Sequence, residues 1–216
     1  MTMNKIAVLG VGRVGAAVAR TALRAGYDVE VAGSGPAEDI ELIAEIVIPG
    51  ATARTAAEAV RDADIVVVAV PLHKHRTVDP AILDGKIVVD AMNYWREVDG
   101  TIPDFERDLS SSEVVARHFR GARLVKTLNH IGYRDLEDHA RPAGAPGRRA
   151  LAVASDDDAA AAAVLEVIDR FGFDGVHSGP LDSGAAFQTG TAIFNGSFTA
   201  SELERELGLD ARTEAA

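Results

Sequence analysis

The chain contains no cysteine and no long hydrophobic run. Without a thiol there is no disulfide, no thiolate nucleophile and no cysteine-ligated zinc or iron–sulfur site. No apolar stretch approaches the ~20 residues that a membrane-spanning helix needs. The first apolar run, Ile6 to Leu9, ends at once in glycine, unlike a secretory leader. We therefore expect a cytoplasmic protein with no membrane partner.

Basic residues are outnumbered by acidic ones, with 22 Lys and Arg against 33 Asp and Glu. The formal net charge is −11 over 216 residues. Such a chain is a poor candidate for binding duplex nucleic acid or an anionic membrane through its overall field, although a local basic pocket can still hold an anionic cofactor. The length and the 47% of hydrophobic residues suit one large soluble α/β domain.

Short apolar runs alternate with longer amphipathic segments. Several runs are apolar at consecutive positions, which is typical of parallel strands covered on both faces. Strands are expected at 5–10, 28–33, 64–70, 86–91, 123–128 and 149–155. Helices are expected at 13–25, 38–46, 55–62, 72–83, 110–119, 131–139, 156–171 and within 199–208. This alternation predicts an α/β fold with a doubly wound, mostly parallel sheet of the Rossmann type.

The predicted domain organisation follows from the same pattern. Residues 1–178 are expected to form an NAD(P)-binding Rossmann domain, and 179–216 a small C-terminal extension that packs on it. The Pro/Gly-rich stretch 141–149 is interpreted as an ordered loop, because another strand–helix–strand unit follows directly. Ser110, three residues before Glu113, indicates a capping box at a helix start.

The stretch "VLGVGRVGAA" at 8–17 indicates a dinucleotide site. Gly10 suits the tight turn out of the first strand, Gly12 lets the backbone approach a pyrophosphate, and Gly15 lets the helix pack closely on the strand. The pyrophosphate would lie over the helix N-terminus, where free N–H groups favour an anion. A glycine-rich turn without a ligand is the alternative.

The end of the second strand bears on the choice of nucleotide. NAD sites usually carry an acid there, whereas residues 32–35 read "AGSG". The missing acid favours NADP, and the Ser34 hydroxyl can donate to a 2′-phosphate. No arginine follows Ser34, so Arg13 is the nearest substitute for the usual phosphate clamp, and NAD stays possible.

The chain resembles the bacterial and archaeal family of NADPH-dependent deazaflavin reductases, also called coenzyme F420-dependent NADP oxidoreductases. The resemblance runs through nearly the whole chain in order. The motifs that carry it are "GVGRVG" at 10–15, "VAGS" at 31–34, "VVVAVPL" at 66–72, "KIVVDAMNYW" at 86–95, "LVKTLNHIG" at 124–132, "RPAGAPGRRALAVASDD" at 141–157 and "GFDGVHSGPL" at 172–181.

The resemblance implies a nicotinamide cofactor, the deazaflavin coenzyme F420 as co-substrate and a homodimer. It implies a Ser-Arg pair for the 2′-phosphate, of which Ser34 is present while Gly35 stands in the place of the arginine. The further cofactor contacts that it implies are Val11, Gly12, Arg13 and Val14 in the glycine loop, and Val70, Pro71, Met92, Asn93, Asn129 and Tyr133 on the nicotinamide side.

Histidines near the strand ends have two readings each. His130 can act as a proton donor to an imine or ketone, or it can be a structural histidine bonded to the backbone. His73 and His75 lack a third ligand, so no metal site is expected. These histidines or Lys74 between them can touch a phosphate or the second substrate, or the segment can be a solvated helix start. Trp95, the only tryptophan, can stack on a flat ring or serve packing.

Three functions remain in view. The first is an NADP-dependent oxidoreductase that exchanges hydride with deazaflavin F420, a reaction that needs no catalytic triad because the cofactors supply the reactivity. The second is a reductase of another small electrophile, such as an imine, quinone or flavin. The third is a dinucleotide-sensing module without turnover. The fold alone does not separate them.

Overall fold

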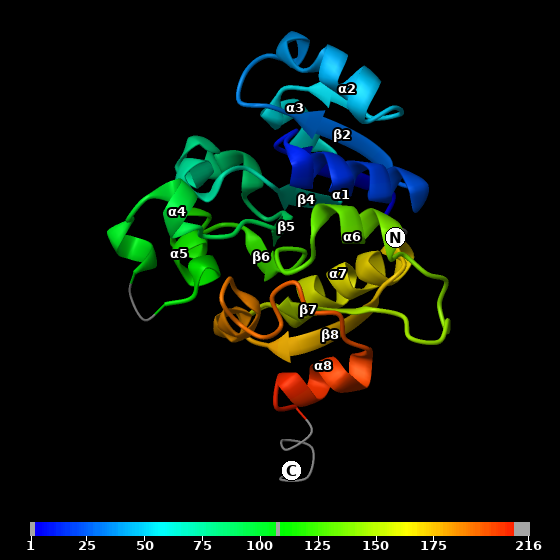
Figure 1. Cartoon of the computed structure of the whole chain (residues 1–216). Coiled ribbons are helices and arrows are strands. Elements are labelled where there is room, and N and C mark those ends of the chain that lie inside the picture. The colour runs from blue at the N-terminus through cyan, green and yellow to red at the C-terminus, as the bar shows by residue number, and fades with distance from the viewer. Residues whose placement is uncertain (1–2, 107–108, 210–216) are drawn as a thin grey trace.

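The computed structural model describes residues 3–106 and 109–209, and within these ranges eight strands form one sheet in the order β3-β2-β1-β4-β5-β6-β7-β8 (Figure 1). The strands are β1 (Lys5–Leu9), β2 (Asp28–Ala32), β3 (Thr52–Arg54), β4 (Ile65–Val68), β5 (Ile87–Asp90), β6 (Arg123–Lys126), β7 (Ala150–Ala154) and β8 (Asp174–Gly179). Every neighbouring pair is parallel except β6 and β7. The predicted doubly wound, mostly parallel Rossmann fold is confirmed.

Helices and 3-10 turns connect the strands. The helices are α1 (Arg13–Arg24), α2 (Glu41–Val47), α3 (Ala56–Arg61), α4 (Arg96–Asp99), α5 (Ser111–His118), α6 (Tyr133–Asp138), α7 (Asp158–Phe171) and α8 (Ala200–Glu206). The 3-10 turns are η1 (Ala37–Asp39), η2 (Leu72–Thr77), η3 (Pro80–Leu83), η4 (Pro103–Phe105) and η5 (Leu181–Phe187). The predicted capping box of α5 is confirmed, since the Ser110 side chain accepts from Glu113 N–H and the Glu113 carboxylate accepts from Ser110 N–H.

The observed elements differ from the predicted ones in several places, and the ranges expected from the sequence include neither α4 nor β8. The single helix expected at 72–83 is wrong, because the segment forms η2 and η3 instead. Pro80 has no N–H to donate, and the Asp79 carboxylate accepts from Ala81 N–H, so a new turn starts there. The edge strand β3 was not expected, since three residues are too few for an apolar pattern.

The two faces of the sheet carry separate apolar cores. Alternate residues of β1 point in opposite directions, so that Ile6 and Val8 face α1 and α7, whereas Ala7 and Leu9 face α3 and α5. Figure 1 shows α1, α6 and α7 side by side over one face. Coverage on both faces explains why the strands are apolar at consecutive positions.

Side chains join β6 to β7, whose antiparallel pairing is limited to Lys126 opposite Ala154. Thr127 Oγ1 donates to the Ala152 carbonyl at 2.7 Å, and His130 Nε2 accepts from Ala152 N–H at 3.0 Å. Ser155 Oγ donates to the Leu124 carbonyl at 2.7 Å. These buried side chains replace the missing ladder and satisfy backbone groups that would otherwise lack partners.

The segment after Gly179 covers the outer end of the sheet. In η5 and α8, Phe187 and Leu203 are fully buried against β7 and β8. The loop at 141–149, before β7, is packed against its neighbours, in agreement with its interpretation as an ordered loop. Its Arg148 side chain is only 4% exposed, and Arg148 Nη1 lies 2.7 Å from Asp169 and 2.8 Å from Asp174.

The start of α1 lies directly against the turn that leaves β1. A Cβ atom on Gly15 would lie 1.8 Å from the Gly10 carbonyl oxygen, so only glycine allows this approach. Gly10 itself has a φ of 111°, which favours glycine. A Cβ atom on Gly12 would meet nothing within 4 Å, although Gly12 stands between them.

These contacts predict effects of very different size for two matched substitutions. Gly15→Ala should lower the free energy of unfolding by at least about 3 kcal/mol because of overpacking, although Gly to Ala in an ordinary helix stabilises by about 1 kcal/mol. Gly12→Ala should change it by no more than about 1 kcal/mol. Urea denaturation of both variants measures the difference, and equal losses would contradict the close approach at Gly15.

Candidate active site

Two clefts meet where the turns after β1 and β4 lie side by side at the carboxyl edge of the sheet. They share Gly12, Ala69, Val70 and Pro71 as a common wall. The strand order reverses between β1 and β4, and open α/β sheets bind their ligands in the crevice at such a point. The glycine loop and the end of β4 are therefore brought together as predicted.

The first cleft has a volume of about 500 Å³ and lies between the glycine loop, the end of β2 and the start of α3. It contains seven predicted cofactor residues: Gly10, Val11, Gly12, Ser34, Val70, Pro71 and Lys74. Its other lining residues are Leu9, Gly33, Ile40, Ala56, Ala57, Ala69, Thr77, Val78, Asp79 and Ile82. Apolar walls with a few polar groups suit a flat base attached to a polar sugar phosphate.

The charges near the end of β2 include one that the sequence interpretation missed. A Cβ atom on Gly35 would lie 2.6 Å from Asp39 Oδ2, so this carboxylate occupies the space beside the glycine. On the other side, Lys74 lines the first cleft. Within residues 3–106 and 109–209 neither charged group has a hydrogen-bond or ion-pair partner. Asp39 was missed because η1 carries it back from four residues further along the chain.

The second cleft, of about 470 Å³, lies between the glycine loop and the ends of β4 and β5. It contains the predicted residues Gly12, Arg13, Val14, Val70, Pro71, Met92 and Asn93, together with Ala69, Leu72, Ala91, Trp95, Val98 and Asp99. Three of these are large apolar side chains with high exposure, Val14 at 37%, Trp95 at 43% and Val98 at 75%. Exposed apolar groups gathered at a concave site favour a flat apolar ligand.

The ionisable side chains lining the second cleft are Arg13 and Asp99. The Asp99 side chain is only 3% exposed, with its Oδ1 2.7 Å from His73 Nδ1 and its Oδ2 accepting from Trp95 N–H at 2.8 Å. Both carboxylate oxygens are therefore occupied in holding α4. His73 serves this carboxylate, and the described ranges contain no group of three side chains suited to a metal ion.

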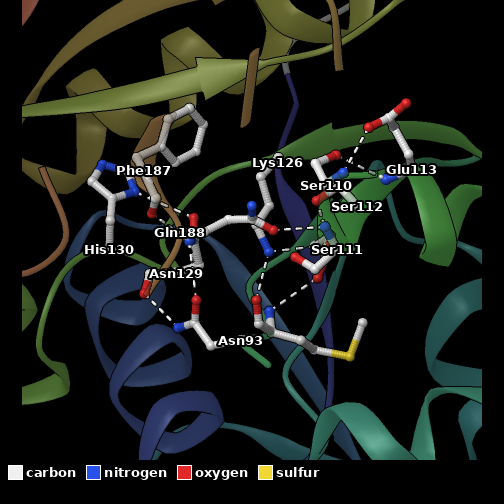
Figure 2. A network of polar contacts seen from close by, with 12 residues as sticks. Asn93, Ser110, Ser111, Ser112, Glu113, Lys126, Asn129, His130, Phe187 and Gln188 are labelled. Carbon is white, nitrogen blue, oxygen red and sulfur yellow. Dashed lines mark hydrogen bonds and ion pairs between the residues drawn. The ribbon is translucent and has the colours of Figure 1, made fainter. Parts of the chain in front are cut away.

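Asn93 is held in place by hydrogen bonds to Asn129, which was also predicted to contact the cofactor (Figure 2). Asn93 Nδ2 donates to the Asn129 carbonyl at 2.6 Å, and Asn129 Nδ2 donates to Asn93 Oδ1 at 3.1 Å. Asn129 Nδ2 also donates to the Phe187 carbonyl at 3.0 Å. The pair joins the end of β5 to the segment after β6 and to the C-terminal extension, but only Asn93 lines the cleft.

His130 is buried and uses both ring nitrogens inside the protein. Its Nε2 accepts from Ala152 N–H, so the ring proton lies on Nδ1, 3.3 Å from Asn129 Oδ1. Burial, assisted by the charges of Arg149 and Lys126, lowers the pKa of His130 to about 3. Of its two readings, the geometry favours a structural histidine. Gly15, Gly35, Asn129, His130 and Tyr133 line neither cleft.

Several residues that the sequence interpretation missed reach the clefts from turns and short helical segments. Thr77, Val78 and Asp79 lie in a stretch expected to be one helix, and Val98 and Asp99 belong to the short helix α4. The sequence around these residues contains no motif that marks them as cleft residues, because turns of the backbone bring each of them to the cleft. Trp95, in contrast, was singled out from the sequence, either as a side chain that stacks on a flat ring or as a packing residue.

The family model described as NADP oxidoreductase, coenzyme F420-dependent, matches residues 5–94. This range holds the glycine loop and most residues of both clefts. A search of curated proteins gives no match. In the described ranges no helix is long and apolar enough to span a bilayer.

Solved structures extend the similarity over the whole fold. The hypothetical protein SMa0349 of Sinorhizobium meliloti is 28% identical, with a TM-score of 0.78, over 91% of this chain and 96% of that one. A candidate F420-dependent NADP reductase from Arthrobacter sp. FB24 is 24% identical, with a TM-score of 0.71, over 98% of this chain and 93% of that one. The Myxococcus stipitatus imine reductase in complex with NADP+ shares the fold at 19% identity and a TM-score of 0.60, over 98% of this chain but 62% of that one.

The family match and the crevice agree on a nicotinamide cofactor. Residues 5–94 are similar to the family of coenzyme F420-dependent NADP oxidoreductases, and this similarity supports an NAD(P)-dependent oxidoreductase.

Proposed function

We propose that this protein transfers hydride between NADPH or NADP+ and the flat ring of a deazaflavin coenzyme of the F420 type. The observation that carries the proposal is the second cleft, which is largely apolar and lies beside the glycine loop; among the described residues that line it, none offers a free carboxylic acid or histidine as a proton donor. Hydride transfer between two stacked rings needs orientation and dry walls from the protein, while the cofactors supply the reactivity.

The residues divide the dinucleotide between the two clefts. Gly12 begins α1 with free N–H groups, and open space above it leaves room for a pyrophosphate. The first cleft would hold the adenosine half. Pro71 and Asn93 would hold the nicotinamide ring, and Trp95 and Val98 would keep water from the side where the acceptor ring enters.

The absence of a proton donor also bears on the alternative acceptors. Reduction of an imine or ketone is helped by a group that protonates the product, and the carboxylate in the second cleft is already held by His73 and the backbone. A flavin or quinone would take its protons from solvent and remains compatible. The lining residues therefore favour a conjugated ring over an imine.

For the nucleotide we propose NADP, with Lys74 supplying the charge that the family arginine would supply at position 35. Ser34 and Lys74 line the first cleft and can donate to a 2′-phosphate. The nearby Asp39 carboxylate opposes the phosphate. The preference for NADP over NAD is thus set by two opposed charges.

Absorbance at the deazaflavin band tests the reaction directly. Purified protein mixed with oxidised F420 and NADPH should bleach the band faster than with NADH, because Ser34 and Lys74 can hold the 2′-phosphate that NADH lacks. Bleaching with NADH alone would overturn the nucleotide choice. Bound nucleotide without bleaching would contradict the deazaflavin proposal, and a lack of transfer to flavins and quinones as well would support a sensing module.

Two charge variants test the nucleotide preference. Lys74→Met should weaken NADPH binding about tenfold, a loss of about 1.4 kcal/mol, and leave NADH binding unchanged. Asp39→Asn should strengthen NADPH binding about threefold through loss of repulsion. Calorimetric titration of both nucleotides with each variant measures these shifts. Equal effects on NADPH and NADH would contradict a role in reading the 2′-phosphate.

The state of His130 predicts a pH dependence of stability. Its folded-state pKa, about 3, lies below the ~6.5 of an exposed histidine, so the unfolded chain binds this proton first. The contribution of neutral, buried His130 to the free energy of unfolding is complete above pH 6.5. It is lost as the pH falls below this value, by up to about 1.4 kcal/mol per pH unit. His130→Gln should therefore make the slope of unfolding free energy shallower between pH 6.5 and 5. An unchanged slope would mean that His130 is accessible to protons in the folded protein.

A further inference from the structure

We infer that the buried pair Asp90–Lys126 is a positioning device for the acceptor end of the crevice, which fixes the main chain of Met92 and through it Asn93. The inference rests on the proposed function, because it assigns a role in that site. Asp90 and Lys126 line neither cleft, so they act through the residues that they hold.

The pair holds both sides of one residue. Asp90 ends β5 and Lys126 ends β6, and both side chains are 0% exposed. Asp90 Oδ1 accepts from Met92 N–H at 3.0 Å, and Lys126 Nζ donates to the Met92 carbonyl at 2.5 Å. Lys126 Nζ lies 3.2 Å from Asp90 Oδ2, which closes the ring of contacts around Met92.

Neighbouring elements complete the network (Figure 2). Ser112 Oγ, at the start of α5, donates to Asp90 Oδ2 at 2.8 Å. The backbone of Gly184 in η5 lies over the aliphatic part of Lys126, since a Cβ atom there would be 3.2 Å from Lys126 Cγ. Gln188 directly follows η5, and its Oε1 accepts a hydrogen bond from Ser111 N–H at 2.6 Å. Figure 2 shows Lys126 between the Asn93–Asn129 pair and these serines.

Stability alone is a weak reason for such a pair. Removing two charges from water is costly, and an apolar pair of similar volume is often at least as stable. The rest of β5 and β6 is indeed buried and apolar at Val88, Val89, Leu124 and Val125. The fully buried charges of these two strands stand at the carboxyl ends, next to residues that line the second cleft, whereas Arg123 at the start of β6 is partly exposed. Their place matches the need to hold a polar main-chain turn in a fixed position.

Lys126→Met tests this role, with Lys86→Met as the matched control. Lys86 also donates its amine to main-chain carbonyls, those of Arg61 and Ala63 at 2.8 and 3.2 Å, but it precedes β5 at the opposite edge of the sheet. Each variant is titrated with 2′,5′-ADP, which probes the first cleft, and with NADPH, whose nicotinamide accepts energy from the single tryptophan, Trp95.

We expect Lys126→Met to bind 2′,5′-ADP within twofold of wild type, to change the energy transfer from Trp95 to bound NADPH, and to lower kcat with F420 at least tenfold while KM for NADPH stays within about threefold. Lys86→Met should match wild type in all four quantities. If Lys126→Met fails to fold, the double variant Asp90→Asn, Lys126→Met leaves no unpaired charge and should show the same pattern.

The outcomes separate the two proposals. A folded variant, judged by 2′,5′-ADP binding, with wild-type energy transfer and wild-type kcat would overturn the positioning role. Equal loss of 2′,5′-ADP and NADPH binding would also overturn it, because the pair would then support the whole fold. Wild-type protein that shows no NADPH signal at all would instead remove the proposed function on which the inference rests.

Discussion

The approach of Gly15 to the Gly10 carbonyl is the contact on which the rest of the site depends. It brings the start of α1 against the turn after β1, so the free N–H groups of that helix face the point where the strand order reverses. The ends of β4 and β5 then form the opposite wall. The crevice is thus a consequence of one backbone contact that a methyl group would prevent.

The chemistry of the crevice follows from what its charged groups already bind. Asp99 holds His73 and the start of α4, His130 joins the segment after β6 to β7, and Asp90 and Lys126 hold Met92. These side chains resemble catalytic acids or bases, but each of them is committed to the structure. A site of this kind orients two rings and excludes water, and the reaction must come from the ligands.

Most of the fold was predictable because its signals are local. Consecutive apolar residues predict the covered strands, and the glycine spacing predicts the turn at 10–15. What escaped prediction depends on chain segments that meet only in the fold. Asp39 reaches Gly35 through η1, Pro80 divides the segment after β4, and Lys126 meets Asp90 across two strands. Asp90 and Lys126 both lie in motifs that were identified in the sequence, but neither motif indicates that the two side chains are in contact.

A crystal structure of the protein with NADP+ tests the central claim most directly, that one dinucleotide spans both clefts across the shared wall of Gly12, Val70 and Pro71. The account predicts the pyrophosphate over Gly12, the 2′-phosphate near Ser34 and Lys74, and the nicotinamide beside Asn93 with its free face open to the second cleft. A nucleotide bound elsewhere, or a nicotinamide ring outside the second cleft, would contradict it.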